Sequence, residues 1–177
     1  MPSNLEKALG FNLEAFNYLY VLCDYETLLK KNITLENFLE ILKKYDVKLL
    51  QYRDKVSDLE LQKQNLIFLK QNLNIPIIVN DKVELIDYAD GLHVGQDDVL
   101  KIDKDKKLAI KLLRKIVKNK LLGLSTHNEL EILEANNFEL DMIGLGAYKA
   151  TNTKDISNIL GEKLQYLSKI SKHPVCA

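Results

Sequence analysis

The sequence predicts an α/β fold, a barrel of the TIM (β/α)8 type, and two observations carry this prediction. Short apolar, β-branched runs alternate with amphipathic segments in units of about 20 to 30 residues, as in strands joined by crossover helices. Polar residues gather where each predicted strand ends, and a parallel barrel places its active site at that end of its strands. A doubly wound open sheet is the alternative. It is disfavoured because no glycine-rich dinucleotide fingerprint follows the first predicted strand.

The individual elements follow from apolar runs and from capping side chains. We expect strands at 18–23, 47–52, 76–79, 91–94, 121–124 and 142–145, and a truncated barrel whose seventh strand begins at Pro174. Helices are expected at 35–44, 59–71, 104–120, 129–135 and 156–170, with Thr34, Asp58 and either Thr126 or Asn128 as N-caps. Residues 1–17 are expected to form a helical extension within a single domain over 1–177.

Composition narrows the classes of function. The 177 residues are 46% hydrophobic with a net charge of zero, which suits one sizeable core. Acidic and basic residues are interspersed, so we do not expect the one-sided basic field that nucleic-acid binding needs. The locally basic stretch 104–120 carries Leu108, Leu112, Ile116 and Val117 at helical spacing. We interpret it as a helix with a solvated, charged face.

Membrane and secretion signals are not evident in the sequence. No apolar run reaches the length of about 18 residues that a membrane span needs, and the N-terminus lacks the pattern of a secretion signal. Cys23 and Cys176 lie far apart without metal-ligand spacing, so reduced thiols fit better than a disulfide. We therefore expect a cytoplasmic protein without membrane contact. A homodimer is an arrangement that the sequence leaves open.

Two carboxylates are predicted to meet at one edge of the sheet. One strand ends at Asn80 and Asp81, the next is followed by Asp97 and Asp98, and consecutive parallel strands end at the same edge. These oxygens, with amide side chains nearby, suit a hard divalent cation such as Mg2+ bound beside a phosphorylated ligand. The alternative is that they are polar loop residues that cap helices.

Gln51, Arg53 and Lys55 alternate along the second predicted strand and therefore project to one side of it. An amide, a guanidinium and an ammonium at a strand end form an anion clamp. Arginine makes a forked contact to phosphate oxygens, and lysine adds a mobile point charge. The alternative is a solvated strand end with salt bridges to Asp54 or Asp58.

The loop after the sixth predicted strand offers two hydroxyls and a cation, from Thr151, Thr153 and Lys154. This composition also suits phosphate, although threonine-rich turns are common. Taken alone, the loop is therefore weak evidence for a phosphate site.

Three further polar residues invite other interpretations. Ser125 and His127 could be taken for a hydrolase pair, but the glycine-flanked elbow of a hydrolase nucleophile does not surround Ser125. We discount that interpretation. His93 lies inside a predicted strand, where a histidine satisfied in the core is the more frequent outcome.

Taken together, these motifs resemble those of the thiamine phosphate synthase family, also called thiamine-phosphate pyrophosphorylase. The resemblance runs from Tyr18 to Ala177. The similar segments are Gln51-Tyr52-Arg53-Asp54-Lys55, Asn80-Asp81, the run from Asp90 to Asp98, Gly123-Leu124-Ser125-Thr126-His127 and Thr151-Asn152-Thr153-Lys154. Any one of them alone would be weak, whereas five in the right order, each at a strand end, are specific.

The resemblance implies a reaction and a set of site residues. The family joins a hydroxymethylpyrimidine diphosphate to a thiazole phosphate and releases pyrophosphate, which gives thiamine phosphate in thiamine biosynthesis. It therefore implies a Mg2+-dependent transferase with two small-molecule substrates and with Asp81 and Asp98 as metal ligands. The implied diphosphate ligands are Arg53, Lys55, Asn80 and Lys154, with Gln51 and Ser125 beside the pyrimidine and Thr151 and Thr153 at the thiazole. The implied catalytic residues are Arg53, Lys55, Ser125 and Lys154.

The sequence departs from the family at two places. Lys149 and Ala150 replace an aromatic-Pro pair before the threonine loop, and the family continues past the predicted seventh strand with a Gly-Gly turn, an eighth strand and a helix. Such barrels commonly bind phosphate after strands seven and eight, so the thiazole phosphate would lose this anchor. An impaired activity and a partner subunit that covers the gap are the alternatives that stay open.

Two other functions stay open beside the synthase. One is a thiazole tautomerase of the same fold with His127 as its acid-base residue, although a tautomerase needs no diphosphate site. The other is a non-catalytic relative that holds a phosphorylated ligand.

Overall fold

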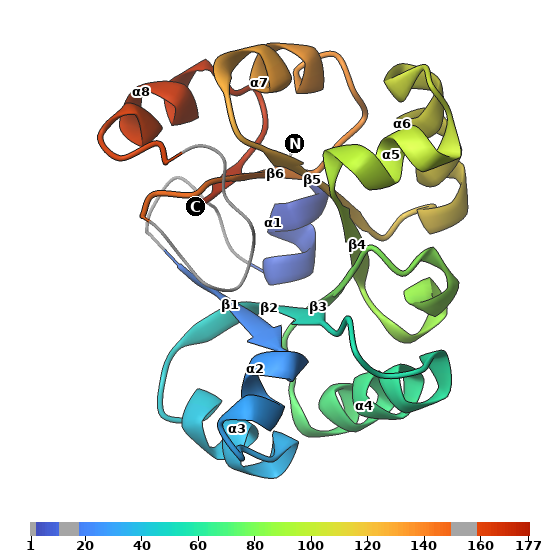
Figure 1. The fold of residues 1–177 in the computed structure, drawn as a ribbon, viewed down its shortest axis with the longest axis vertical. Coiled ribbons are helices and arrows are strands. Elements are labelled where there is room, and N and C mark those ends of the chain that lie inside the picture. The colour runs from blue at the N-terminus through green and yellow to red at the C-terminus, as the bar shows by residue number, and fades with distance from the viewer. Residues whose placement is uncertain (1–2, 11–17, 150–158) are drawn as a thin grey trace. The chain divides into compact units, whose positions relative to one another are not determined.

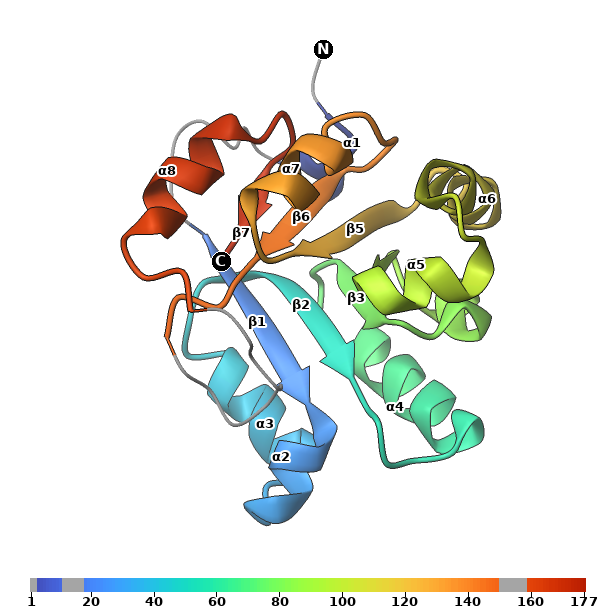
Figure 2. The ribbon, with the colours of Figure 1, turned by 45° about the horizontal axis from the view of Figure 1, so that its top comes forward.

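The computed structural model describes residues 3–10, 18–149 and 159–177. Figures 1 and 2 show strands that alternate with helices along the chain, as the sequence predicts. The chain divides into two compact units, Met1–Leu92 and His93–Ala177.

The first unit is built on parallel strands that follow one another in chain order. The strands are β1 (Leu19–Asp24), β2 (Val47–Arg53) and β3 (Ile77–Asn80). The helices are α1 (Asn4–Leu9), α2 (Tyr25–Lys30), α3 (Leu35–Leu42), α4 (Leu59–Asn72) and the 3-10 helix η2 (Val83–Tyr88). β1 pairs with β2 so that Asp24 stands opposite Arg53, and β2 pairs with β3. In Figure 1, α2, α3 and α4 lie on one side of these strands.

Capping side chains determine where the helices of this unit begin. Thr34 and Asp58 each accept a hydrogen bond from a backbone N–H three residues further on, at 3.2 and 2.8 Å. Both caps were predicted and are confirmed. Asp24 is a third cap, at the start of α2, which was not among the predicted caps. It lies at the junction of β1 and α2, opposite Arg53 of β2.

The second unit repeats the alternation of strand and helix, after β4 (Gly91–Val94) at its boundary. Its elements are α5 (Gln96–Ile102), α6 (Lys106–Val117), β5 (Leu121–Thr126), α7 (Glu129–Ala135), β6 (Met142–Leu145), α8 (Lys163–Ile170) and β7 (Val175–Cys176). β6 pairs in parallel with β5 and with β7. Asn128, not Thr126, caps α7 by accepting from the Glu131 N–H at 2.9 Å.

The last helix begins later than predicted. A start near residue 156 was expected, and residues 150–158 lie outside the described part, but 159–162 are not helical. Gly161 has φ 51°, a left-handed conformation that an α-helix does not contain. α8 therefore begins only at Lys163.

The basic stretch forms a helix, but most of the four apolar positions named from the sequence are not the ones that it buries. Leu108, Leu112 and Ile116 are 44, 37 and 47% exposed, and only Val117 of the four named positions is buried. The buried side chains of α6 are Ala109, Ile110, Leu113 and Val117. The sequence holds two adjacent apolar stripes at helical spacing, and spacing alone cannot tell which one packs against the strands.

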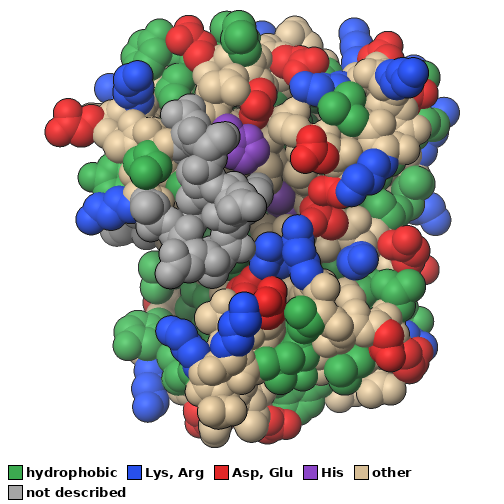
Figure 3. All heavy atoms as spheres, viewed as in Figure 1, with side chains coloured by type: hydrophobic (Ala, Val, Ile, Leu, Met, Phe, Trp, Pro, Cys, Tyr) green, Lys and Arg blue, Asp and Glu red, His purple; other side chains and the backbone are tan. Residues whose placement is uncertain are grey.

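The core and the surface agree with the composition. Fully buried side chains come mainly from the strands and the inner helix faces, for example Leu50, Leu66, Ile78 and Leu122. Acidic and basic side chains are interspersed on the face shown in Figure 3. None of the helices in the described part of the chain has the length and apolar composition that crossing a bilayer requires. The pKa of the Cys23 thiol is raised to about 12, mainly by burial and to a smaller extent by the nearby carboxylates.

Candidate functional site

The carboxyl ends of β1, β2 and β3 form one edge of the first unit, because the three strands are parallel neighbours. β1 ends at Asp24, β2 ends at Arg53, and β3 ends at Asn80, with Asp81 directly after it. Acidic, basic and amide groups therefore lie along one strand-end edge. We call this set, with Lys55, the strand-end cluster of the first unit.

Gln51 and Arg53 project to the same side of β2, as predicted, and each contacts β1. The Gln51 Nε2 donates to the Tyr20 hydroxyl at 2.6 Å. The Arg53 guanidinium donates to the carboxylate of Asp24. The Arg53 side chain is only 14% exposed and the Asp24 side chain 9%. The alternative partners named from the sequence, Asp54 and Asp58, are therefore wrong for Arg53.

Asp24 binds two elements at once. Its Oδ1 accepts from the Thr27 N–H at 2.9 Å and from the Thr27 hydroxyl at 2.6 Å, while Oδ2 accepts from Arg53. Burial opposes its ionisation, but these hydrogen bonds and the Arg53 charge outweigh burial and hold the pKa of Asp24 below its usual value. Asp24 thus stays charged and fixes the direction of the guanidinium.

Hydrogen bonds to the Asp54 carboxylate hold the backbone of the segment that contains Lys55. It accepts a hydrogen bond from the Tyr52 hydroxyl at 2.9 Å and from the backbone N–H groups of Val56 and Ser57 at 3.0 and 2.9 Å. The Asn65 amide donates to the same hydroxyl at 2.9 Å. Burial raises the pKa of Tyr52, so this phenol stays protonated and can donate to Asp54.

Lys55 and Asp81 complete the strand-end cluster. The Lys55 ammonium is 4.0 Å from Asp81 Oδ2 and its side chain is 54% exposed, so it can move toward a ligand. Asn80 Nδ2 donates to the same Asp81 oxygen at 2.5 Å. Asp81 has φ 60°, the left-handed region that aspartate and asparagine tolerate better than most residues. A strained turn thus presents a carboxylate at the edge.

In the second unit, Ser125 lies at the end of β5 and is held by two residues of the β4–α5 segment. The His93 Nε2 is 3.1 Å from the Ser125 Oγ. The Gln96 Nε2 donates to the Ser125 carbonyl at 2.7 Å. The prediction of a satisfied core histidine at His93 is confirmed, because its side chain is 5% exposed and contacts Ser125. The cross-strand contacts of His93 and Gln96 with Ser125 cannot be read from either residue alone.

His127 is paired with Glu131. Its Nδ1 is 3.0 Å from Glu131 Oε2, which also accepts from the His127 backbone N–H at 2.8 Å. The Oγ of Ser125 contacts His93, so the side chain that orients Ser125 is His93 and not His127. The predicted site residues Thr151, Thr153 and Lys154 lie outside the described residues.

Asp81 in the first unit and Asp98 in the second unit each carry a carboxylate, the kind of oxygen donor that Mg2+ prefers. Asp98 lies in the first turn of α5, packs over Gly95 and pairs with Lys101 at 2.8 Å. The side chains of Asp81 and Asp98 are 20 and 28% exposed, so each carboxylate is held in place and still accessible. Across the described residues, no three His, Cys, Asp or Glu side chains form a metal-binding group. Mg2+ commonly takes only one or two protein carboxylates and completes its shell with water and phosphate, so the donor chemistry of either carboxylate fits this ion.

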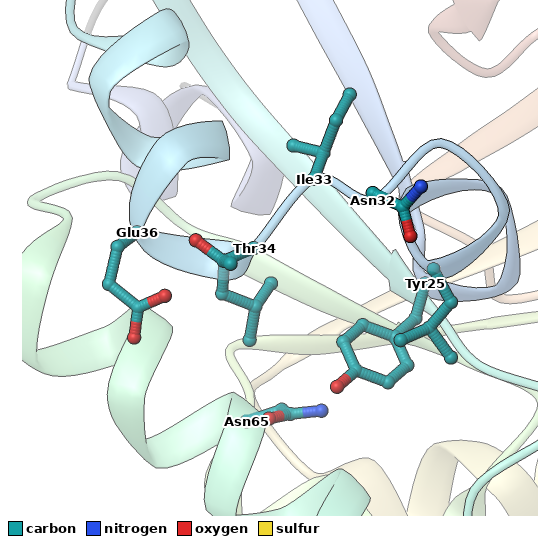
Figure 4. Close-up of a pocket in the computed structure, with 8 residues that line it drawn as sticks. Tyr25, Asn32, Ile33, Thr34, Glu36 and Asn65 are labelled. Carbon is teal, nitrogen blue, oxygen red and sulfur yellow. The ribbon is translucent and has the colours of Figure 1, made fainter.

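A cavity of about 430 Å3 lies elsewhere in the first unit, among α2, α3 and α4. Figure 4 shows Tyr25 and Asn65 pointing toward each other on one side and Thr34 and Glu36 at the start of α3 on the other. The predicted site residues do not line it. Hydrogen bonds from the start of α3 lower the pKa of Glu36, so a carboxylate already occupies that helix end.

The pairing of Asp24 with Arg53 predicts a pH-dependent contribution to stability. Asp24→Asn should lower the free energy of unfolding at pH 7 by about 1.5–3 kcal/mol, because asparagine keeps the cap but loses the charged contact. The folded-state pKa lies below the unfolded one, so this contribution is present above pH 4 or so and is lost as the pH falls through the lowered value. Urea unfolding at pH 7 and at pH 3 measures it.

Asp58→Asn is the matched control for this prediction. It makes the same change at an exposed cap, where the hydrogen bond to the Leu61 N–H remains possible. Its effect should be within about 0.5 kcal/mol, as is usual at such surface positions. An Asp24→Asn effect of equal size at both pH values would contradict the charged role of Asp24.

A solved structure confirms the predicted fold class. Thiamine phosphate pyrophosphorylase from Pyrococcus furiosus aligns with a TM-score of 0.69 at 24% sequence identity, over 93% of this chain and 75% of that one. The likeness shows an α/β fold of the TIM type. The chain is thus an α/β-barrel protein with charged and amide side chains at the carboxyl ends of its strands.

Sequence comparisons place the chain more narrowly. It belongs to the thiamine monophosphate synthase family, whose model matches residues 19–177. A thiamine-phosphate synthase of Persephonella marina is 35% identical over 136 residues, and one of Chloroflexus aurantiacus is 37% identical over 111 residues. These matches cover 72 and 59% of this chain. The chain spans 60 and 47% of the length of these two relatives. The resemblance inferred from the motifs is confirmed.

Proposed function

We propose that this protein is a thiamine phosphate synthase, a transferase that joins hydroxymethylpyrimidine diphosphate to thiazole phosphate and releases pyrophosphate. The observation that carries the proposal is the strand-end cluster of the first unit. There Arg53 and Lys55 lie at the same strand-end edge as Asn80, the last residue of β3, and Asp81, which follows it. Membership of the family supports it.

The strand-end cluster suits a diphosphate better than a neutral ligand. Arg53 is held in direction by Asp24, so its fork is pre-organised for phosphate oxygens. Lys55 is exposed and contributes a mobile charge, and Asn80 can donate from its amide. In the proposal these three residues and Lys154 bind the diphosphate, and Gln51 and Ser125 contact the pyrimidine. Thr151 and Thr153 are assigned to the thiazole.

The proposed reaction needs charge stabilisation rather than a protein nucleophile. Departure of pyrophosphate leaves a pyrimidine-methyl cation, and the thiazole nitrogen then forms the new C–N bond to it. Cationic side chains that meet the negative charge growing on the leaving group lower the barrier. Arg53, Lys55 and Lys154 would supply the positive charge. The reaction does not need a serine or cysteine that is activated as a nucleophile.

Asp81 and Asp98 are the proposed protein ligands of Mg2+. Their carboxylates offer the hard oxygen donors that this ion prefers. The chemistry that Mg2+ supplies when bound is neutralisation of charge on the diphosphate. Asp81 is pre-positioned by its left-handed backbone and by the Asn80 amide, and Asp98 by its place over Gly95.

The proposal is tested by calorimetric titration of the folded chain with hydroxymethylpyrimidine diphosphate, with and without Mg2+. Binding that requires Mg2+ is expected, and a product assay with thiazole phosphate then separates a synthase from a non-catalytic binder. A chain that isomerises the thiazole phosphate but does not bind the pyrimidine diphosphate would be a tautomerase, and this result would overturn the proposal.

A further inference from the structure

The imidazole of His93 occupies a space that exists because two neighbouring strand positions are glycine. A Cβ atom on Gly123 of β5 would lie 2.5 Å from His93 Nδ1, closer than real contacts allow. A Cβ atom on Gly144 of β6 would lie 3.0 Å from Cε1 and 3.2 Å from Nε2. His93 itself is 5% exposed. The second unit thus builds a fitted slot for this ring across two strands.

The slot aims one edge of the ring at Ser125. The His93 Nε2 is 3.1 Å from the Ser125 Oγ, while Gln96 holds the carbonyl of the same serine at 2.7 Å. The next residue, Thr126, donates its hydroxyl hydrogen to the Gly144 carbonyl at 3.0 Å. These contacts hold the backbone around Ser125, and His93 acts on the Ser125 hydroxyl, whose hydrogen can rotate.

A serine hydroxyl has one hydrogen to donate and two lone pairs, and its direction is free unless a partner fixes it. If the His93 Nε2 accepts, Ser125 donates to the ring and offers only lone pairs to a ligand. If the Nε2 carries the hydrogen, Ser125 keeps its own hydrogen for the ligand. In either tautomer the ring decides which hydrogen-bonding character Ser125 presents.

We propose that His93 is a positioning residue that orients the Ser125 hydroxyl for recognition of the pyrimidine ring. This inference rests on the proposed function, which assigns Ser125 to the pyrimidine. It predicts that His93 acts on pyrimidine affinity through Ser125 alone and leaves the contact with the diphosphate unchanged.

The test is a double-mutant cycle on the affinity for hydroxymethylpyrimidine diphosphate with Mg2+, measured by calorimetry. His93→Asn cannot reach the Ser125 Oγ and should weaken binding about five- to tenfold, the range of one neutral hydrogen bond. His93→Gln places an amide near the former Nε2 position and should recover most of the affinity. In a Ser125→Ala background, His93→Asn should have no further effect. Affinity for inorganic pyrophosphate with Mg2+ should stay unchanged in every variant.

Two further variants keep the test decisive. Gly144→Ala presses on the ring at Cε1 and Nε2 without removing either partner, so it should mimic His93→Asn if that variant does not fold. His173→Asn removes another partly buried histidine, which bonds to the Ala135 carbonyl at 3.0 Å, and should leave affinity unchanged.

Three results would overturn the inference. The first is a double variant whose loss of binding free energy equals the sum of the losses from His93→Asn and Ser125→Ala. The second is equal losses for the pyrimidine diphosphate and for pyrophosphate. The third is a His93→Asn variant that binds as the unmodified chain does. Failure of the unmodified chain to bind the pyrimidine diphosphate would instead overturn the proposed function, and this inference with it.

Discussion

Arg53→Met is expected to reduce thiamine phosphate formation by about 10²- to 10³-fold, the range seen when one group that stabilises developing charge is removed. The guanidinium is the most buried cation of the strand-end cluster and is already directed by Asp24. Its loss removes both the charge and the forked contact to diphosphate oxygens. Steady-state kinetics with both substrates and Mg2+ measures the effect.

The same substitution should also lower stability, and this effect has to be separated from catalysis. Asp24 would be left charged and buried without its partner, which costs about 3–5 kcal/mol in comparable buried pairs. The double variant Asp24→Asn/Arg53→Met removes both charges and should recover much of that loss. Its turnover should stay as low as that of Arg53→Met. Recovery of turnover in the double variant would show that Arg53 serves only the structure.

Asp81→Asn is expected to produce a loss of similar size, about 10²- to 10³-fold in turnover, together with a weaker response to Mg2+. Asparagine tolerates the left-handed backbone of this position, with φ 60°, as aspartate does. The substitution therefore removes the charge and leaves the turn. A titration of activity against Mg2+ concentration measures it.

Asp87→Asn is the matched control for Asp81→Asn, since Asp87 is an exposed carboxylate in η2 of the same unit. Its Mg2+ response should equal that of the unmodified chain. An Asp81→Asn variant that keeps the full Mg2+ response would contradict the role of Asp81 as a metal ligand.

Local patterns in the sequence were sufficient to predict most elements of the fold. β-branched runs and capping residues placed β4 and β6 at their observed bounds and identified Thr34 and Asp58 as caps. They failed where two local solutions compete. The two apolar stripes of α6 have the same period, and only packing selects the one that contains Ile110.

For the candidate site, too, local patterns predicted the direction of side chains but not their distant partners. Alternation along β2 correctly placed Gln51 and Arg53 on one side of the strand. The partners of these residues could not be predicted, because they depend on register between strands that are distant in sequence. The pairing of Asp24 with Arg53 and the reach of His93 to Ser125 both span about 30 residues.

Whether the chain is a synthase is decided by an assay of thiamine phosphate formation from both substrates with Mg2+, with Asp98→Ala measured beside the unmodified chain. Asp97→Ala is the matched control, because Asp97 is the exposed neighbouring carboxylate in the same turn of α5. We expect turnover in the unmodified chain and in Asp97→Ala, and no turnover in Asp98→Ala. A folded chain that forms no thiamine phosphate, or an Asp98→Ala variant that turns over normally, would contradict this expectation.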